Sequence, residues 1–420
     1  MHDFAIIGGG IAGLAIAELL QRSGRAVVLL EAEKAVCMQS SGQQQGWFHT
    51  GALYAALPSS RYFRHLVGNL DDLLNYYTCF PGMNLCTGRH LLTRNGNGWF
   101  QNATNYYLYA SPRDSSIPAH QKPLWGLATL RAQSRLSWFE TLDFTRELSP
   151  QVKGLCMNFN LSRCVSMRQL QLRPGVVGKT FRSRDRSINT RMLHSDLLSS
   201  FLSHGGELRT NVRVQRIDRH AVADQNKTYT ARNIIVAAGQ NIRHLTGIKT
   251  AVWKSPLLVI KPAVTDVNFI WMHPNTEQTF NHIYHQTADG DYSIIGNAAF
   301  WPVDEEVDEA AVHLALRKKV ATVFGQEIAP SRTSLYFGFK TELVNEPRKR
   351  NYQYQIVDTG DYVLAIPGKL SLAFSLAVNV CRHFGVDPVL ELRELAAQQT
   401  LSCDTLLEDT EHFKRYLALP

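Results

Sequence analysis

The sequence lacks the cysteine patterns on which disulfide frameworks and zinc sites depend. Its seven cysteines are an odd number, and no two of them form a C-x-x-C pair. This argues against a disulfide framework and a metal site, and it favours reduced thiols in a cytoplasmic protein. We therefore expect no bound metal. The cysteines are Cys37, Cys79, Cys86, Cys156, Cys164, Cys381 and Cys403.

Long apolar runs are also missing. No stretch reaches the length of about 20 residues that a membrane-spanning helix needs, although a peripheral membrane contact is compatible with the sequence. A glycine-rich turn already starts at Gly8, which leaves no room for a signal peptide before the first strand. We therefore expect a protein without a cleaved leader.

Charge of one sign is not concentrated in any long run, although the net charge is +8. Basic residues gather only in short pieces such as 182–186 and 348–350, so we expect no nucleic-acid partner. Anionic ligands or a mildly basic, solvated surface explain the charge. Repeats and low-complexity linkers are absent as well, and 420 residues with 45% hydrophobic content suit two globular domains or one interleaved pair.

The stretch 3–35 has the order of a nucleotide-binding βαβ unit. An apolar run, Phe4–Ile7, predicts a buried strand, and residues 8–13 read GGGIAG, a G-x-G-x-x-G motif. A helical stretch follows, and a second apolar strand, Ala26–Leu30, ends at Glu31. Together these pieces predict a dinucleotide site.

Each part of this motif has a physical role. Gly8 permits the tight turn from strand to helix, Gly10 lets a pyrophosphate approach the backbone, and Gly13 lets helix and strand pack closely. The helix start directs free N–H groups and the positive end of its dipole at the phosphates. Glu31, 18 residues after Gly13, is placed to accept the ribose hydroxyls. An ordinary βαβ unit with a glycine turn is the alternative.

A polar loop with several glycines, residues 37–54, follows the second strand and is too long for a simple connector. Its position lies near the crevice at the carboxyl ends of the strands, where ligands bind. The loop contains Ser40-Ser41-Gly42 and then His49-Thr50-Gly51-Ala52-Leu53-Tyr54. In these motifs the chain resembles the D-amino-acid-oxidase (DAO) superfamily of flavoproteins, and it is most similar to the L-2-hydroxyglutarate dehydrogenase and glycerol-3-phosphate dehydrogenase branches. Those enzymes carry a Ser-Ser-Gly loop that leads into a His-x-Gly-x-x-Tyr segment beside the flavin.

The rest of the chain predicts further helices and strands. Helices are expected over Arg61–Tyr77, near Ala132–Leu142, from Asn189 to Gly205, over Asp304–Phe324 and from Pro367 to about Phe384, with a polar helical tail over 389–420. Strands are expected over Met83–Thr93, Glu207–Ile217, Asn233–Gly239, Lys254–Val264, Thr279–His285, Asp291–Asn297, Thr333–Leu343, Tyr352–Val357 and Tyr362–Ile366.

The resemblance implies an α/β fold (α+β overall), in which a Rossmann-like FAD-binding domain is combined with a discontinuous antiparallel-sheet substrate domain. We assign residues 1–80, 170–250 and 350–388 to the FAD-binding domain, and residues 81–169 and 251–349 to the substrate domain. Residues 389–420 are the C-terminal tail. The active site is expected at the junction of the two domains.

The resemblance also implies FAD as the cofactor. A plain NAD-binding domain would not need the late return of the chain near Val214 and Gly239, so this return favours FAD over NAD. The turn at 367–372 starts a helix, whose N-terminus can stabilise negative charge at the flavin edge. The residues expected to bind FAD are Gly8, Gly10, Ile11, Ala12, Gly13, Glu31, Ala32, Ser40, Ser41, Gly42, Gln45, Gly46, Val214, Ala238, Gly239, Gly368, Lys369, Leu370 and Ser371.

His49 and Lys340 are the expected catalytic groups. The pKa of a histidine suits a base that takes a hydroxyl proton as hydride leaves the carbon. A covalent bond to the flavin, as in some amine-oxidising relatives, and a purely structural role are the alternatives for His49. Lys340 is expected to anchor an anionic substrate where relatives carry an arginine, although lysine cannot form a bidentate fork. A solvated or structurally paired lysine is the alternative.

Four aromatic or imidazole side chains are second-rank candidates for the substrate pocket. Each of them also suits a buried position with a satisfied polar tip, which is the alternative. They are Tyr54, His282, Tyr284 and Tyr336.

These features predict an FAD-dependent oxidoreductase that moves a hydride to flavin N5 from a C–H bearing a hydroxyl, with a small 2-hydroxy acid as the preferred substrate. Oxygen or another acceptor then reoxidises the flavin. Oxidation of an amino acid or secondary amine, as in glycine or sarcosine oxidase, is an alternative, and so is a role in a biosynthetic pathway. A non-catalytic nucleotide-binding sensor is the alternative from another class, but it would not require the 37–54 loop or the 368–371 turn.

Overall fold

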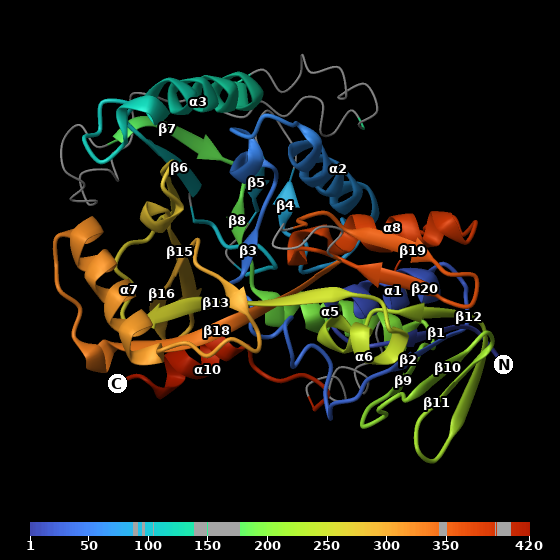
Figure 1. Cartoon of the computed structure of the whole chain (residues 1–420). Helices are drawn as coiled ribbons and strands as arrows, with labels where there is room; N and C mark the ends of the chain where they lie inside the picture. The colour runs from blue at the N-terminus through green and yellow to red at the C-terminus, as the bar shows by residue number, and fades with distance from the viewer. Residues whose placement is uncertain are drawn as a thin grey trace.

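The computed structural model of the chain describes residues 1–86, 91–94, 97–103, 105–137, 149, 177–343, 351–390, 392 and 405–420 (Figure 1). Within these ranges, every helix is too short or too polar to cross a lipid bilayer.

The first sheet has eight strands and is built around β1 (His2–Ile7). β1 pairs in parallel with β2 (Val27–Leu30) on one side and with β12 (Thr228–Val236) on the other. All four residues of β2 are buried, as expected for a parallel strand that is covered on both faces. The outer strands are β9 (Glu207–Arg209), β10 (Arg216–Asp218), β11 (Ala221–Ala223), β19 (Gln355–Asp358) and β20 (Val363–Ile366).

Three helices from distant parts of the sequence pack together on one face of this sheet. α1 (Ile11–Arg22) contacts both α5 (Thr190–Ser203) and α8 (Ala373–His383). Their apolar side chains form one core with alternate residues of β1 and β2. The Asn189 side chain caps α5 by accepting the Met192 N–H at 3.1 Å, as its sequence predicts.

The second sheet also has eight strands and is mostly antiparallel. Its longest pair joins β13 (Thr250–Ile260) to β18 (Thr333–Leu343) along their whole length. α7 (Glu309–Phe324) packs on β13 and on β16 (Gly290–Asn297) at the outer side of the molecule (Figure 1). The other strands are β6 (Asn105–Ala110), β7 (Val177–Ser183), β14 (Asn268–Met272), β15 (Phe280–Thr287) and β17 (Trp301–Pro302).

The remaining elements connect and cover the two sheets. β3 (Trp47–Phe48) pairs with β8 (Arg186–Ser187), and β4 (Leu85–Cys86) pairs with β5 (Leu92–Thr93). The other helices are α2 (Arg61–Tyr76), α3 (Lys122–Ser137), α6 (Ile242–Thr246) and α10 (Glu411–Ala418). The short 3₁₀ turns are η1 (Ala52–Tyr54), η2 (Ala119–Gln121), η6 (Gly239–Asn241), η7 (Thr276–Gln278), η8 (Pro330–Arg332) and η9 (Leu370–Leu372).

The expected fold class, α/β with parallel and antiparallel sheets, is confirmed. Two predicted strands are wrong. Met83–Thr93 contains β4 and β5, which pair antiparallel and so cannot be one strand, and Glu207–Ile217 divides into β9 and β10. Between them Asn211 has φ 57°, and the Val212 N–H donates to Glu31 O at 2.8 Å, so the chain leaves the line of the strand there.

Two predicted helices also differ from the structure. α3 begins at Lys122, ahead of the expected start near Ala132, and residues 138–142 lie outside the described ranges. In the predicted tail, α10 is the helix among the described residues, while 391 and 393–404 lie outside them. The hydrophobic core is continuous from α1 to the second sheet, so the division into two domains stays a prediction.

Candidate active site

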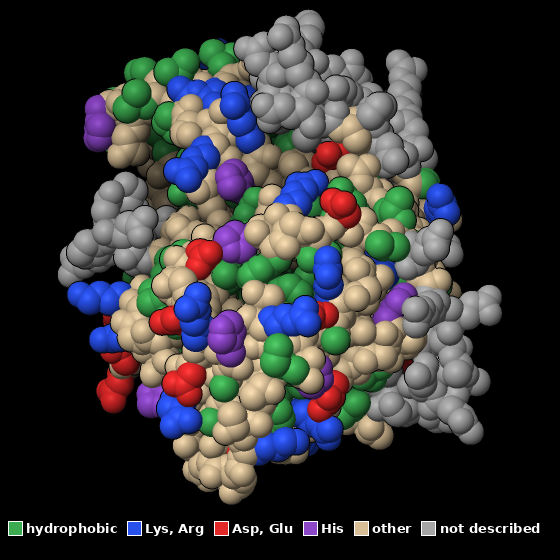
Figure 2. Space-filling view, turned by 90° about the vertical axis from the view of Figure 1, so that its right-hand side faces the viewer, with side chains coloured by type: hydrophobic (Ala, Val, Ile, Leu, Met, Phe, Trp, Pro, Cys, Tyr) green, Lys and Arg blue, Asp and Glu red, His purple; other side chains and the backbone are tan. Residues whose placement is uncertain are grey.

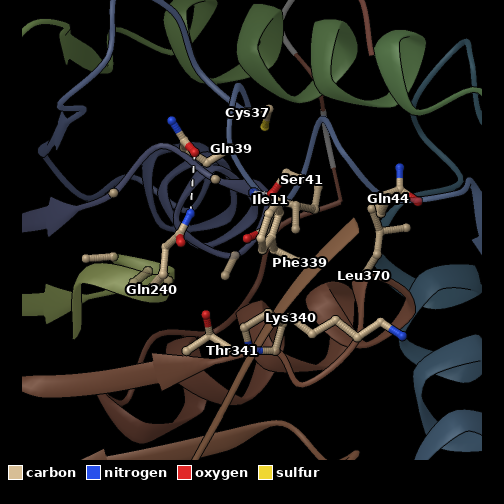
Figure 3. Close-up of a pocket in the computed structure, with 18 of the residues that line it drawn as sticks. Ile11, Cys37, Gln39, Ser41, Gln44, Gln240, Phe339, Lys340, Thr341 and Leu370 are labelled. Atoms are coloured by element: carbon tan, nitrogen blue, oxygen red, sulfur yellow. Dashed lines mark hydrogen bonds between the residues drawn. The ribbon is translucent and has the colours of Figure 1, made fainter. Parts of the chain in front are cut away.

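A cavity of about 390 Å³ lies where the two sheets meet. Both sheets and the long loop contribute to its walls. Figure 3 shows Ile11 and Ser41 on one side of this cavity and Lys340 and Thr341 on the other. The lining comes from the β1–α1 turn, the loop 37–49, the segments 212–215 and 237–245, strands β13 and β18, and the turn 365–371.

The β1–α1 turn requires glycine at two positions. Gly8 has φ +103°, and a Cβ at this residue would lie 2.6 Å from Ala237 O. A Cβ at Gly13 would collide with Gly8 O. Only glycine therefore lets α1 start this close to the end of β1.

The start of α1 directs backbone donors toward the cavity. Its N-cap residue, Gly10, has no side chain to cap the first turn, and Ser41 Oγ accepts the Ile11 N–H at 2.9 Å. Gly10 and Ala12 also line the cavity. A helix N-terminus of this kind favours a phosphate group.

Two buried polar atoms in the cavity wall have no hydrogen-bond partner within the described part of the chain. They are Gln44 Nε2 and Thr341 Oγ1. The other end of the Gln44 amide is occupied, because its Oε1 accepts the Gly46 N–H at 2.5 Å. A buried polar atom without a partner carries a free-energy penalty, so both atoms fit a polar ligand.

Glu31 lines the cavity directly after β2. Its carboxylate accepts the N–H of Gly9 at 2.5 Å and the N–H of Glu33 at 2.8 Å. Burial raises the pKa of Glu31, and these two backbone bonds oppose the rise. Each carboxylate oxygen keeps a second lone pair, which can accept a ribose hydroxyl.

The turn 367–371, which directly follows β20 of the first sheet, contacts the long loop beside the cavity. Gly368 has φ +63°, and a Cβ there would collide with Gln353 O. Ser371 Oγ accepts the His49 N–H at 2.8 Å and donates to Trp47 O at 3.4 Å. This contact joins two segments that are more than 300 residues apart.

His49 pairs with a buried carboxylate that the sequence did not identify. His49 Nδ1 lies 3.2 Å from Asp185 Oδ2, and a carboxylate only accepts, so Nδ1 carries the proton. Asp185 is fully buried and also accepts bonds from Trp47, Thr50 and Tyr107. These distances are 2.9 Å to Trp47 Nε1, 2.8 Å to both Thr50 N and Thr50 Oγ1, and 2.5 Å to Tyr107 OH.

Asp185 and His49 differ in their charge at neutral pH. Burial would raise the pKa of Asp185, but the bonds from His49, Tyr107 and Thr50 hold it below its usual value. Burial lowers the pKa of His49 to about 4, and the positive charge of Lys369 acts in the same direction, while Asp185 opposes it. At neutral pH the pair is therefore a carboxylate and a neutral imidazole, with His49 Nε2 unprotonated.

Two lysines give this end of the cavity a positive potential. Lys340 and Lys369 both line the cavity, and both lower the pKa of His49 through their charge. Lys369 Nζ lies 5.4 Å from the ring centroid of Tyr54 and 5.2 Å from that of Tyr352. Figure 3 shows Lys340 extended toward the side on which Leu370 and Gln44 lie.

The structure brings most of the predicted FAD-binding residues together. Gly13, Gly42 and Gly46 lie outside the cavity lining, and a Cβ at any of them would lie closer than 3.0 Å to a neighbouring atom. The residues that line the cavity itself are Gly8, Gly10, Ile11, Ala12, Glu31, Ala32, Ser40, Ser41, Gln45, Val214, Ala238, Gly239, Gly368, Lys369, Leu370 and Ser371, together with the predicted catalytic residues His49 and Lys340.

The four second-rank candidates lie outside this lining. His282 is buried inside the second sheet, where its ring nitrogens lie 2.8 Å from Val267 O and 2.6 Å from Ser293 Oγ. Tyr284 is two residues further along β15 and faces the same side as His282. Tyr336 is buried. Tyr54 packs against Tyr62 and Tyr352. The four side chains therefore do not line this cavity as expected.

Sequence reasoning missed Asp185, Gln44 and Thr341. Asp185 is the one acid in the basic piece 182–186, and no spacing connects it to His49. Gln44 lies in the long loop between the predicted FAD-binding residues Gly42 and Gln45. Thr341 directly follows Lys340, but neighbouring strand residues normally face opposite sides.

Comparisons with known proteins give both a family and a fold. A family model described as FAD dependent oxidoreductase (DAO) matches residues 3–340. L-alpha-glycerophosphate oxidase from Mycoplasma pneumoniae, solved with FAD bound, is similar at 14% identity and a TM-score of 0.65, over 93% of this chain and 96% of that chain. No curated protein sequence matches the chain.

Two further solved structures are similar over nearly their whole length. Glycine oxidase from Geobacillus kaustophilus has 13% identity and a TM-score of 0.62, over 93% of this chain and 96% of that chain. L-amino acid deaminase from Proteus vulgaris has 13% identity and a TM-score of 0.62, over 93% and 92%. At these identities the structures share the fold alone, and their different substrates leave the substrate class open.

The turn at Gly13 gives the first prediction. Gly13→Ala places a methyl group against Gly8 O and should destabilise the protein by about 3 kcal/mol or more. The purified variant should hold much less FAD per chain, measured by absorbance near 450 nm. Gly126→Ala is the control, because a Cβ there meets open space in α3 and should stabilise the helix by about 1 kcal/mol. Full FAD content and unchanged stability of Gly13→Ala would contradict the role of this turn.

Proposed function

This chain belongs to the DAO family of FAD-dependent oxidoreductases, and we propose that it oxidises a small anionic substrate, a 2-hydroxy acid, at the carbon that carries the hydroxyl group. When bound, FAD supplies the hydride acceptor for this reaction. The buried His49–Asp185 pair beside two lysines carries the proposal.

The residues of the cavity fit FAD. The start of α1, whose N-cap residue Gly10 has no capping side chain, suits a pyrophosphate, and the unpaired atoms Gln44 Nε2 and Thr341 Oγ1 fit polar ligand atoms. We propose that this helix start and Ser41 hold the pyrophosphate, that Glu31 holds the ribose, and that the turn 368–371 faces the flavin edge. Val214 meets the adenine through its backbone and Gly239 lies close to the cofactor, as the family resemblance implies.

His49 is proposed as the base for the hydroxyl proton. Asp185 fixes the proton of His49 on Nδ1, so Nε2 has a free lone pair for the substrate. When the hydroxyl proton passes to Nε2 and the carbon loses a hydride, the C–OH becomes C=O. Asp185 stabilises the imidazolium that results, and it is itself held by Trp47, Thr50 and Tyr107.

Lys340 and Lys369 are proposed to hold the anionic group of the substrate. Both side chains line the cavity and act on His49 through their charge, so a carboxylate at this end would be attracted to them. Lysine binds as a point charge and fixes orientation less strongly than an arginine fork. Lys340 lies on β18 and Lys369 lies in the turn 368–371. The two lysines offset this difference because they hold the anion from two directions.

Oxidation of an amino acid or secondary amine is the second candidate. The lone pair of a neutral amine assists hydride loss without a base, whereas a hydroxyl must lose a proton during the reaction. A histidine that is held by a buried carboxylate therefore favours the hydroxyl substrate. A covalent bond between flavin and His49 would use the same Nε2, and colour released on acid precipitation would exclude it.

Further properties follow from the same proposal. Oxygen or another small acceptor must take up the electrons. Figure 2 shows one face of the molecule, on which basic side chains are dispersed among acidic ones. This distribution supports a small-molecule substrate over a nucleic acid. We also propose a cytoplasmic location, supported by the free thiols of Cys37, Cys79 and Cys381 in the described part of the chain.

Flavin bleaching tests the proposed substrate class. The purified protein should be yellow, and anaerobic addition of a small 2-hydroxy acid should remove the absorbance near 450 nm as the flavin is reduced. The screen should contain matched pairs in which hydroxyl, primary amine or secondary amine stands on the same carbon skeleton. Bleaching by the amines alone would replace the proposal with the second candidate.

His49 gives a prediction for the chemical step. His49→Gln should lower kcat by about 10²–10⁴-fold with bound FAD retained. His65→Gln on α2 is the control, because His65 lies outside the cavity lining. In the wild type the neutral imidazole persists until the pH falls to about 4, so the acid limb of kcat/KM should not appear near pH 6.5. A limb near pH 6.5, or full activity of His49→Gln, would remove His49 as the base.

Lys340 gives a prediction for substrate binding. Lys340→Met should raise KM for the anionic substrate by about 10-fold or more, because a lost charge-assisted hydrogen bond costs about 1.5–3 kcal/mol. Lys318→Met, on the exposed side of α7, is the control of equal charge change. An unchanged KM in Lys340→Met would place the anion elsewhere.

A further inference from the structure

The C-terminal segment, residues 405–420, has no role in the chemistry above, yet it contacts the loop that lines the cavity. The Glu411 N–H donates to Gly42 O at 2.8 Å, and the Val36 N–H donates to Leu406 O at 3.0 Å. Val36 and Leu407 also form a parallel bridge. The loop is therefore bonded through its backbone to the opposite end of the chain.

The same segment is anchored on the second sheet. His412 Nδ1 lies 2.7 Å from Tyr292 OH, and the rings of Tyr416 and Tyr292 stack at 4.7 Å. Lys261 Nζ donates to Leu419 O at 2.8 Å. His412 and Tyr416 are buried, so α10 has a fixed position beneath β13 and β18 (Figure 1).

A histidine pair connects this anchor to the loop a second time. His285 stacks on His412 with ring centroids 4.9 Å apart, and its Nε2–H donates to Gln45 O at 3.1 Å. Gly46 packs so tightly on His285 that a Cβ at Gly46 would lie 2.7 Å from the ring. Both Gly42 and Gln45 are thus held from the side away from the cavity.

The loop is held at its two ends, where the Cys37 N–H donates to Gly9 O at 3.0 Å and the Ile188 N–H donates to Gly46 O at 2.8 Å, and its middle is bonded to the C-terminal segment through Gly42. Cys37 has φ +59°, a left-handed conformation that is uncommon for residues other than glycine. Within the loop, the Gly42 N–H donates to Gln39 O at 2.8 Å. The position of Ser41, whose Oγ accepts the Ile11 N–H, is therefore set by residues on both sides of it.

Ion pairs at the edge of the segment contribute less. Lys34 Nζ lies 2.6 Å from Glu408, and Arg191 Nε lies 2.9 Å from Asp409. The side chains of these pairs are partly exposed to solvent, and exposed pairs contribute little to stability. The backbone bond at Gly42 and the buried histidine pair are the main contacts by which the segment holds the loop.

We propose that residues 405–420 form a C-terminal clasp that holds the loop 37–46 closed over the cofactor and slows the release of FAD. The clasp acts through the loop, so its residues are positioning residues and have no part in the chemical step. The proposal rests on the placement of FAD in the cavity, and it is independent of the substrate.

Glu411→Pro removes the central contact with little other change. Glu411 is the first residue of α10, where a helix N–H has no intrahelical partner and proline is tolerated. Thr410 has φ −66° and ψ 151°, which suits the residue before a proline. Glu411→Ala is the matched control, because it keeps the N–H while it also removes the side-chain pair with Arg415.

Two measurements on the holoenzyme test the clasp. After dilution, Glu411→Pro should release FAD about 3–10-fold faster than Glu411→Ala, followed by flavin fluorescence. Amide hydrogen exchange over residues 37–46 should also be faster in Glu411→Pro. A change in the thermal midpoint alone, with FAD release and loop exchange equal in the two variants, would show a merely structural role of this bond.

Equal FAD release and equal loop exchange in the two Glu411 variants would overturn the clasp. Should Glu411→Pro not fold, His412→Phe gives the same test, because it keeps a ring on His285 but removes the bond to Tyr292. Faster release and exchange would support the clasp, and wild-type values would overturn it. A wild-type protein without FAD would contradict the proposed function instead, while loop exchange would still test the clasp.

Discussion

The buried carboxylate of Asp185 is the constraint on which the active site depends. An ionised carboxylate without contact to water requires donors for its lone pairs, and here they come from Trp47, His49, Thr50 and Tyr107. Tyr107 belongs to β6 of the second sheet, and the other three belong to the long loop. One carboxylate thus joins the loop to β6 and sets the tautomer of His49. The same residue therefore serves both the packing of the loop and the chemistry proposed for His49.

The same loop is fixed from two other directions. Ser371, near the start of α8, accepts the His49 N–H, and Ser41 accepts the first N–H of α1. The loop therefore touches both ends of the nucleotide-binding half, and the clasp closes its outer side through Gly42. In the proposed site, FAD binding and substrate chemistry would be coupled through this loop, because a shift of its backbone would move Ser41 and His49 together.

The sequence predicts the parts of the site that depend on local rules. The glycine turn and Glu31 follow from backbone conformation and spacing, and the role of the 368–371 turn is what the family resemblance implies. All three lie around one cavity in the structure. The Asp185–His49 pair could not be found this way, because it joins residues 136 apart through tertiary packing. His282 and Tyr284 were expected in the pocket, but side chains alternate along β15 and the cavity-lining residue there is Asn281. The C-terminal tail gave no functional signal, since its main contact uses backbone atoms.

The central claim is that the amino-terminal turn and the distant 368–371 turn hold one flavin beside His49. A crystal structure of the protein with FAD and a 2-hydroxy acid that is not turned over tests this most directly. We predict the pyrophosphate at the start of α1, the isoalloxazine against residues 368–371, and the substrate hydroxyl within hydrogen-bond distance of His49 Nε2. A flavin bound elsewhere, a nicotinamide in the cavity, or a His49 turned away from the substrate would contradict the account.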